Sequence, residues 1–263
     1  MIASFVKRLW GHPLSRGVNV NDAHAVERHR QILRSNALLR SVYLRWYQEC
    51  MPAYEATKGL EGDIVEIGSG AGFLDEEIPG LIKTDVVRGP SIQKIVDAMN
   101  MDFEDEQLRA IFMIGVLHHL PFPSQFLAEA QRCLKRGGRL IMIEPNNSLI
   151  ERVLCRVLDH YEYWDDSIGD WTNEAASRMT KANLALSWVI LVRDRKRFEA
   201  EFPALKVLDI RYHTFLSYIL SGGMSYRPFL PAFCLPAVKV IEALANPFMR
   251  NLGTLMTVEI EKV

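Results

Sequence analysis

Apolar residues recur every three or four positions over residues 21–58, near the start of the chain. The positions that carry this pattern are Ile32, Leu33, Leu38, Leu39, Val42, Tyr43, Trp46 and Tyr47. The spacing predicts an α-helix with one apolar face. Asn21 or Asp22 can cap its start, and Pro52, which has no backbone N–H, should end or kink it.

A second pattern begins at Gly62, where short apolar runs predict buried strands. The runs are residues 63–67, 81–87, 110–116 and 139–143. A helix is expected at about 123–135, followed by Gly137 and Gly138 where a helix end and a tight turn belong. Strands that alternate with helices predict an α/β fold with a parallel sheet covered on both faces.

The end of the chain is organised differently. Residues 205–212 and 254–262 both alternate as strands, and if they pair, about forty residues are inserted between them, far more than an ordinary connection. We therefore expect two elaborations over one rim of the sheet, at 145–193 and 213–253. Residues 186–192 fit a strand and a buried helix equally well.

Composition narrows the class of protein. The chain has 263 residues, 49% hydrophobic and 24% charged, with a formal net charge of −1. This is globular usage, and it lacks the concentrated positive charge that nucleic-acid binding needs. Four scattered cysteines indicate free thiols in a reducing compartment. Because we see no secretory signal and no uninterrupted apolar stretch of ~18 residues, we expect a cytoplasmic protein.

The strongest chemical signal is the sequence VEIGSGAGF, at residues 65–73. A strand runs directly into Gly68, Gly70 and Gly72, which permit a tight turn and a close approach of the backbone to a ligand. A helix that follows would point its N–H groups at the turn. The motif alone also fits a plain strand-to-helix turn. Phe73 occupies the last glycine position of the nicotinamide-binding fingerprint, which disfavours a dehydrogenase.

Further polar residues follow the successive strands. Asp85 ends the next strand, where a carboxylate can accept two hydrogen bonds from a ribose diol. Asp97 and Ala98 precede another strand, which ends in GVLHHLP, and a later strand closes at Glu144 and Pro145.

This succession resembles the class I S-adenosylmethionine-dependent methyltransferases, in particular the bacterial methyltransferase type 11-like group, most densely over residues 61–145. The resemblance implies a doubly wound, mostly parallel seven-stranded sheet of the Rossmann-like methyltransferase fold. It also implies N-terminal helices and a helical insertion before the last strand. We expect residues 1–60 to form an N-terminal helical cap and residues 61–263 the methyltransferase domain.

The resemblance also implies roles for individual residues toward S-adenosylmethionine. The first motif, which wraps the methionine moiety and the adenosine, corresponds to Glu66, Gly68, Ser69, Gly70 and Gly72. Asp85 corresponds to the ribose-binding acid, Asp97 to the acid that receives the adenine amino group, and Ala98 to the amide beside it. Ile114 and Gly115 correspond to the backbone that faces the methionine amino group.

Three departures affect the adenine side: a very short first helix containing Pro79, Met101-Asp102-Phe103 in place of Leu-Pro-Phe, and Arg109 in place of an aspartate.

The methyl acceptor is less defined. The Asn/Asp-Pro-Pro-Tyr/Phe tetrapeptide that grips a planar amino group is absent after the fourth strand, so an oxygen acceptor is favoured, then carbon. His118, His119 and His160 are the candidate bases, since histidine titrates near neutrality.

The candidates for substrate contact are Glu144, Glu162 and Trp164. Each has a structural alternative: the histidine pair can shape the pocket, the segment around His160 can be a capped surface turn, and Glu144 can satisfy backbone amides. No cluster in the sequence has metal-ligand spacing, so no metal is expected.

Residues 213–253 are rich in aromatic and aliphatic side chains, with a cationic fringe of Arg227, Lys239 and Arg250. They fit an interfacial segment that gathers a lipid-linked acceptor at the inner face of a membrane. They also fit a helical cap on the sheet rim or a dimer face.

The resulting hypothesis is an S-adenosylmethionine-dependent O-methyltransferase of a small-molecule or glycan/lipid-linked acceptor. Relatives of this kind often accompany polysaccharide biosynthesis. The alternatives are a C- or O-methyltransferase of quinone-like lipids and a non-catalytic S-adenosylmethionine-binding regulatory module.

Overall fold

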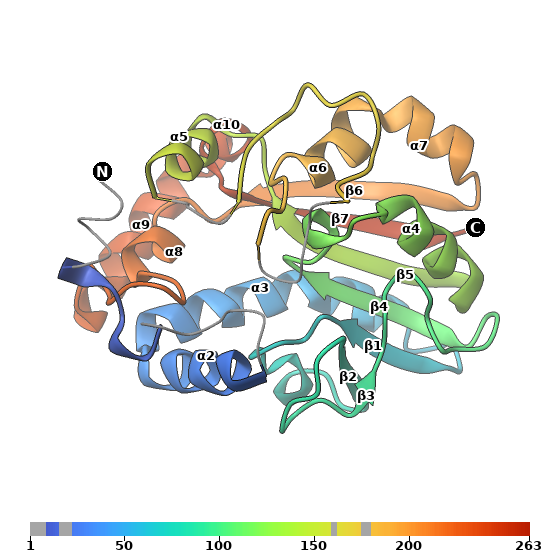
Figure 1. The fold of residues 1–263 in the computed structure, drawn as a ribbon, viewed down its shortest axis with the longest axis horizontal. Coiled ribbons are helices and arrows are strands. Elements are labelled where there is room, and N and C mark those ends of the chain that lie inside the picture. The colour runs from blue at the N-terminus through green and yellow to red at the C-terminus, as the bar shows by residue number, and fades with distance from the viewer. Residues whose placement is uncertain (1–8, 16–22, 159–161, 175–179) are drawn as a thin grey trace.

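The computed structural model describes residues 9–15, 23–158, 162–174 and 180–263. Its centre is a seven-stranded sheet with the strand order β3-β2-β1-β4-β5-β7-β6 (Figure 1). The strands are β1 (Asp63–Ile67), β2 (Leu81–Asp85), β3 (Lys94–Ile95), β4 (Leu108–Ile114), β5 (Leu134–Pro145), β6 (Leu205–His213) and β7 (Leu255–Lys262). Strands β1 to β5 pair in parallel, whereas β7 pairs antiparallel with both β5 and β6. The predicted mostly parallel sheet and the pairing of the last two strands are confirmed.

Both faces of the sheet are buried, because alternate residues of each central strand join two different cores. In β1, Ile64 packs with the N-terminal helices α2 (Ala23–Ser35) and α3 (Ala37–Ala56). Val65 and Ile67 pack on the other side, with α4 (Pro123–Cys133), α6 (Leu186–Trp188) and α7 (Arg195–Glu201). The continuous apolar runs seen in the sequence are therefore strands buried on both faces.

The predicted single helix over residues 21–58 is two helices. The side chain of Asn36 accepts a hydrogen bond from the N–H of Leu39 at 3.0 Å and so caps the start of α3. The caps expected at Asn21 and Asp22 lie outside the described residues. Pro52 does not end α3, which continues to Ala56, because Ala53 and Tyr54 beyond it are buried against the sheet.

The helix expected directly after the glycine motif, already predicted to be very short because of Pro79, is reduced to less than one α-helical turn. The described segment between Gly72 and β2 contains a 3-10 turn, η2 (Leu74–Glu76), and Pro79-Gly80 follows too soon for a longer helix. The face that a crossover helix would cover is instead covered by α3, which contacts β4 and β5. The N-terminal helices thus complete the sheet packing of the domain.

Several boundaries differ from the sequence pattern, including those of β4, which begins and ends two residues earlier than its predicted run. Strand β2 stops at Asp85, and β5 already begins at Leu134. The expected turn at Gly137, which has φ +77°, is an irregularity inside β5, where the pairing with β4 shifts register. Residues 186–192 are helical, with α6 continuing into the π-helical turn η4 (Val189–Arg193). Periodicity could not decide this last segment because its side chains are mostly buried.

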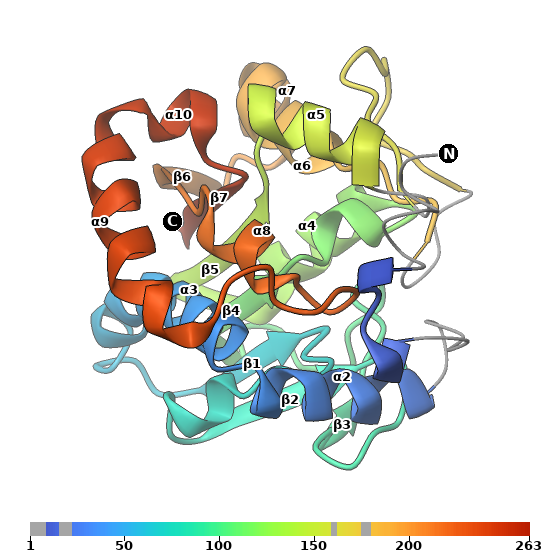
Figure 2. The same cartoon turned by 90° about the vertical axis from the view of Figure 1, so that its left-hand side faces the viewer.

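The two elaborations lie together at one end of the molecule (Figure 2). The first contains α5 (Leu149–Leu158). The second contains α8 (Ser217–Ser221), η5 (Ala232–Cys234), α9 (Leu235–Ala245), η6 (Asn246–Phe248) and α10 (Met249–Leu252). Two further short turns are η1 (Pro13–Ser15) and η3 (Leu117–His119). By length and composition alone, the helical stretch Ala232–Leu252 could cross a membrane.

Candidate active site

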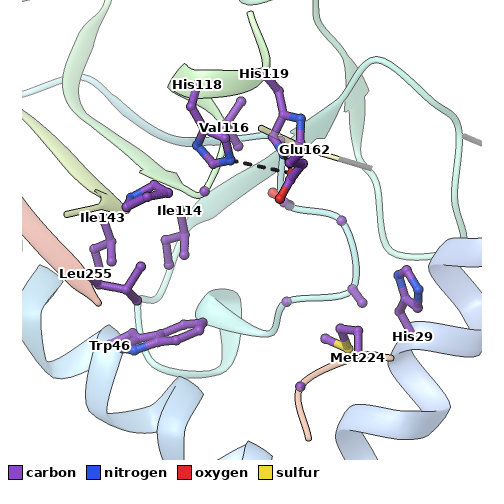
Figure 3. A pocket seen from close by; sticks show the side chains of 18 of the residues that line it. His29, Trp46, Ile114, Val116, His118, His119, Ile143, Glu162, Met224 and Leu255 are labelled. Atoms are coloured by element: carbon purple, nitrogen blue, oxygen red, sulfur yellow. Dashed lines mark ion pairs between the residues drawn. The ribbon is translucent and has the colours of Figure 1, made fainter. Parts of the chain in front are cut away.

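A cavity of about 740 Å³ opens at the carboxyl ends of β1, β4 and β5. Parallel sheets commonly bind ligands at this edge. One part of the wall is the glycine loop after β1, and other parts come from helices α2 and α3 and from the insertion between β6 and β7. Figure 3 shows His118, His119 and Glu162 on one side of the cavity, Trp46 and Leu255 on another, and His29 with Met224 on a third.

The glycine loop has the backbone conformation that the sequence indicated. Gly68 and Gly70 have φ values of +68° and +50°. A Cβ at Gly68 would lie 2.6 Å from the side chain of Val116, so that glycine is needed for packing. A Cβ at Gly70 would meet nothing closer than 3.9 Å, because this residue borders open space on the cavity side. The loop is therefore shaped for close approach of a ligand at Gly70.

Asp85 and Asp97 lie on the same rim as the loop. The buried carboxylate of Asp85 accepts hydrogen bonds from the N–H of Gly70 and of Val87, each at 3.1 Å. Asp97 is exposed, and its Oδ1 accepts from the N–H of Met99 at 2.9 Å. Both acids line the cavity, together with Ala98 and Met99. Asp85 thus holds the glycine loop as well as facing the position expected for a ribose.

Glu66 lies beneath the loop and lines the cavity with a buried carboxyl group. Burial raises its pKa to about 7, although the nearby Lys83 ammonium opposes this shift. Lys83 itself donates to the carbonyl of Gly72 and pairs with Asp75 at 3.1 Å. Within the described residues, Glu66 Oε2 has no hydrogen-bond partner. A buried carboxyl group with a vacant acceptor is suited to bind a cationic group of a ligand. The amino and sulfonium groups of S-adenosylmethionine are cationic groups of this kind.

Gly115 and Ile114 end β4 at the cavity floor. Gly115 has φ +65°, and its N–H donates to the carbonyl of Ile143 at 2.8 Å. A ligand amino group donates its hydrogens, so at this point it would have to be received by a carbonyl oxygen.

Glu144 fixes the turn that follows β4. It is completely buried, and its Oε1 accepts from the N–H of Val116 at 2.9 Å and of Leu117 at 2.8 Å. Its Oε2 lies 2.6 Å from Nδ1 of His118 and accepts from the hydroxyl of Ser187 at 2.8 Å. Burial alone would raise the pKa of Glu144, but His118 and these donors hold it below its ordinary value. Glu144 lies behind the lining residues, where it positions the turn.

The two histidines of this turn have opposite electrostatic environments. Burial would lower the pKa of His118, but the Glu144 carboxylate outweighs it, so the pKa lies above its ordinary value. Burial and the positive charge of His118 lower the pKa of His119, despite the opposing Glu162. At neutral pH, His119 is therefore the histidine better suited to accept a proton.

Glu162 connects the histidine pair to the first elaboration. Its Oε1 lies 3.1 Å from Nε2 of His119 and 3.9 Å from Nε2 of His118 (Figure 3). One ligand-type atom from each of the three residues lies within 4.8 Å of the others, so the cluster could hold a divalent cation. The sequence predicted no metal cluster because Glu162 is 43 residues away from His119 and only the fold unites them.

One other predicted residue lies away from the cavity lining. Trp164 is half-buried and packs against the core on the α4 side, behind the residues that line the cavity. His160 lies outside the described residues. The structure also adds lining residues that sequence reasoning did not select: His29, Tyr43, Trp46 and Tyr47 from the N-terminal helices, and Met224, Tyr226 and Phe229 from the insertion. The aromatic positions 43, 46 and 47 carried a signal, but helical spacing presented them as ordinary core.

The strand order, the glycine loop and the acids on its rim define a Rossmann-like, nucleotide-cofactor-binding class of protein. Comparison with known proteins is more specific. Residues 65–142 match a family model described as a methyltransferase domain. Over 76 residues, 28% of this chain, the sequence is 38% identical to phthiotriol/phenolphthiotriol dimycocerosates methyltransferase 1 of Mycobacterium ulcerans. That match spans 24% of the relative's length.

A solved structure shares the fold over nearly the whole chain. It is the geranyl diphosphate C-methyltransferase of Streptomyces coelicolor A3(2), in complex with Mg²⁺, geranyl diphosphate and S-adenosyl-L-homocysteine. The two chains are 12% identical with a TM-score of 0.51, and the likeness covers 97% of this chain and 89% of the other. The sequence match thus shows that residues 65–142 are similar to a methyltransferase domain, and the solved structure shows the same fold over nearly the whole chain.

Proposed function

We propose that the protein transfers the methyl group of S-adenosylmethionine to a hydroxyl oxygen of a small-molecule or glycan/lipid-linked acceptor. The observation that carries the proposal is the His118–His119–Glu162 cluster, which faces the same cavity as the glycine loop. A hydroxyl acceptor must lose a proton as its carbon–oxygen bond forms, and a positioned histidine can take that proton.

The residues divide into two groups by role. The glycine loop, Asp85, Asp97 and Glu66 form the cofactor side, where bound S-adenosylmethionine supplies an activated methyl group on a sulfonium. His119 takes the hydroxyl proton as the oxygen bonds to the methyl carbon and the carbon–sulfur bond breaks. Glu162 then stabilises the resulting imidazolium at 3.1 Å. Glu144 holds His118 and the turn in place, and alignment of the acceptor supplies the rest of the rate.

Three alternatives use the same cavity differently. A C- or O-methyltransferase of quinone-like lipids would bring a ring against the aromatic wall at Tyr43, Trp46 and Tyr47. A non-catalytic binding module would keep the cofactor side and need no base. A metal-assisted transferase would use the three-residue cluster as ligands. The acceptors named for the two relatives differ, so the comparisons favour no acceptor for this chain.

The test replaces His119 by asparagine, which keeps a polar side chain and abolishes the titration. Formation of S-adenosylhomocysteine is measured against a panel of hydroxylated small molecules, phenols and lipid-linked glycans. Loss of a general base should lower turnover by about 10²–10⁴ and flatten the acidic limb of the pH profile. Cofactor affinity, measured by calorimetry, should stay within a few-fold.

The matched control is His24→Asn, on an exposed position of α2. Turnover of His119→Asn within a few-fold of wild type would refute the base. A parallel series with and without a chelator separates the metal alternative, because a proton-transfer mechanism is insensitive to chelation. S-adenosylhomocysteine binding without turnover on any acceptor would favour the regulatory module.

A further inference from the structure

Large apolar side chains are exposed along the outer surface of the insertion. We call the group formed by Phe233, Val240, Ile241, Leu244 and Phe248 the docking face. Their exposed fractions are 82%, 59%, 48%, 75% and 62%. All five belong to the continuous helical stretch η5–α9–η6, at the end of the molecule that faces the viewer in Figure 2. Singly exposed apolar residues are ordinary, but five on one helical stretch indicate an interaction surface.

Helix α9 buries its acidic residue and exposes large apolar residues, the opposite of an ordinary surface helix. Its acidic residue, Glu242, is buried, and its Oε1 accepts from the N–H groups of Phe215, Leu216 and Ser217. Its other oxygen pairs with Arg45 of α3. Val240 and Leu244 are two positions before and after Glu242, so they lie on the opposite side of the helix and face outward. A helix that buries its acid and exposes its apolar residues has an outer surface suited to an apolar environment.

Within the insertion itself, the exposed charges have one sign. Between residues 213 and 253 the basic residues are Arg227, Lys239 and Arg250, all exposed, and the one acidic residue is the buried Glu242. A surface with apolar side chains and a cationic fringe is complementary to an anionic lipid bilayer.

The same charges disfavour a second copy of the chain as the occupant. A symmetric dimer interface brings the same patch together twice. It would place the cationic fringe of one copy against that of the other, with no exposed acid in the insertion to neutralise it.

A membrane-spanning role is disfavoured by Glu242. Crossing a bilayer would require α9 to leave Arg45 and the three N–H groups and to carry Glu242 and Lys239 into hydrocarbon, at a high cost. The stretch is therefore suited to lie flat at the interface, with the apolar side chains inserted and Glu242 still bonded to the domain.

The segment just before the docking face in the chain lines the cavity. Phe229 belongs to this segment, and its ring stacks on Trp10 with centroids 6.0 Å apart. Tyr226 and Met224 extend this lining inward. We propose that the η5–α9–η6 stretch docks on an anionic lipid surface and so brings the cavity mouth to acceptors held in the bilayer. The docking itself does not depend on the proposed chemistry, whereas the delivery of an acceptor rests on it.

The experiment is co-sedimentation of the full chain with vesicles of phosphatidylcholine alone or with added phosphatidylglycerol. We expect binding to the anionic vesicles, falling as salt rises from about 0.05 to about 0.5 M because the cationic fringe is screened. Leu244→Ser combined with Phe248→Ser should lower the partition coefficient by about tenfold or more. Both side chains are exposed, so the melting temperature should change little. Leu208→Ser, at a 40% exposed position on β6, is the matched control and should bind like wild type.

Each outcome decides the proposal. Loss of binding in the double variant with an unchanged control supports it. No binding of wild type to anionic vesicles overturns it. Equal binding of wild type and the double variant overturns it too, as does release of bound protein by detergent alone, which indicates insertion across the bilayer. A concentration-dependent dimer that the double variant abolishes, without vesicle binding, assigns the face to a second copy. Methyl transfer is not measured, so a failure of the proposed chemistry would leave these results unchanged.

Discussion

At the scale of single residues, Glu66 brings a buried carboxyl group to the cavity lining. Its pKa of about 7 is raised from 4.5 by burial. The folded protein therefore holds this proton at pH values where the unfolded chain has lost it. The resulting stability is fully present below about pH 4.5 and is lost as the pH rises through about 7. A ligand cation next to Glu66 would favour the ionised carboxylate and so lower its pKa.

We predict that cofactor binding releases the proton from Glu66, so that the affinity contributed by this residue increases as the pH rises toward 7 and levels off above it. Below the pKa, the increase approaches about tenfold per pH unit. Calorimetry of S-adenosylmethionine binding across this range, in two buffers with different ionisation enthalpies, measures both affinity and proton release. The cofactor's own amino group also titrates, so the comparison is with Glu66→Gln, which should show a flatter profile. Identical profiles for the two proteins would contradict the assignment.

The position of a site residue could be predicted from the sequence only where that residue follows the end of a strand. Gly68, Gly70, Asp85 and Asp97 follow successive strand ends, and parallel strands bring those ends to one edge. The acceptor side follows no such rule. Glu162 reaches His119 through an elaboration whose path no local pattern specifies, and Trp46 enters the wall because α3 happens to cover the sheet there. Such contacts depend on tertiary packing and are not visible in spacing.

At the scale of elements, the turn after β4 depends on Glu144. One carboxylate accepts from two backbone N–H groups, from Ser187 and from His118. We predict that Glu144→Gln weakens His118 positioning, because an amide nitrogen cannot accept the Nδ1–H of His118. The pKa of His118 should fall, and its titration by NMR measures this directly.

The same substitution should cost about 1–3 kcal/mol of stability, as expected for a disturbed buried polar group, and lower turnover with little change in cofactor affinity. Ser187→Ala is the control, since it removes one donor and leaves the histidine–carboxylate pair intact. An unchanged His118 titration in Glu144→Gln would show that Glu144 only supports the backbone.

Among the elements, the strands were predictable and two helical boundaries were not. Apolar runs with glycine or acid at their ends marked β1, β2, β4 and β5 to within a few residues, because burial on both faces leaves a continuous apolar signal. The break between α2 and α3 at Asn36 could not be predicted from the sequence, because the apolar pattern continues through it and the cap is a single side chain. The very short helix after the glycine loop was predictable from Pro79, although its 3-10 geometry was not.

At the scale of the whole molecule, the insertion is held to the N-terminal helices by a small set of buried polar contacts. Trp46 Nε1 donates to the Thr214 hydroxyl at 2.9 Å, and Asn36 donates to the carbonyl of Ser221 at 2.8 Å. Glu242 joins Arg45 to three N–H groups of the segment that enters α8. Since α3 also packs on the sheet, these contacts close the cavity between elements from both ends of the chain.

We predict that Glu242→Gln loosens this closure and destabilises the protein by about 2–3 kcal/mol, because it leaves Arg45 and the N–H donors imperfectly paired. For a chain of this size that is a fall in melting temperature of about 4–10 °C. Burial alone would raise the pKa of Glu242, but the Ser217 N–H and Arg45 hold it below 4.5. Its contribution is therefore present above about pH 4.5 and is lost as the pH falls through the lower folded-state value, so the variant should lose less stability on acidification than wild type.

The control is Glu49→Gln, which breaks the half-buried pair with Arg211 and should cost under about 1 kcal/mol. Thermal melts of both variants at neutral and acidic pH measure these differences. If Glu242→Gln melts like wild type at both pH values, the insertion is held by its apolar contacts alone, and the buried acid only lowers the charge of the docking helix.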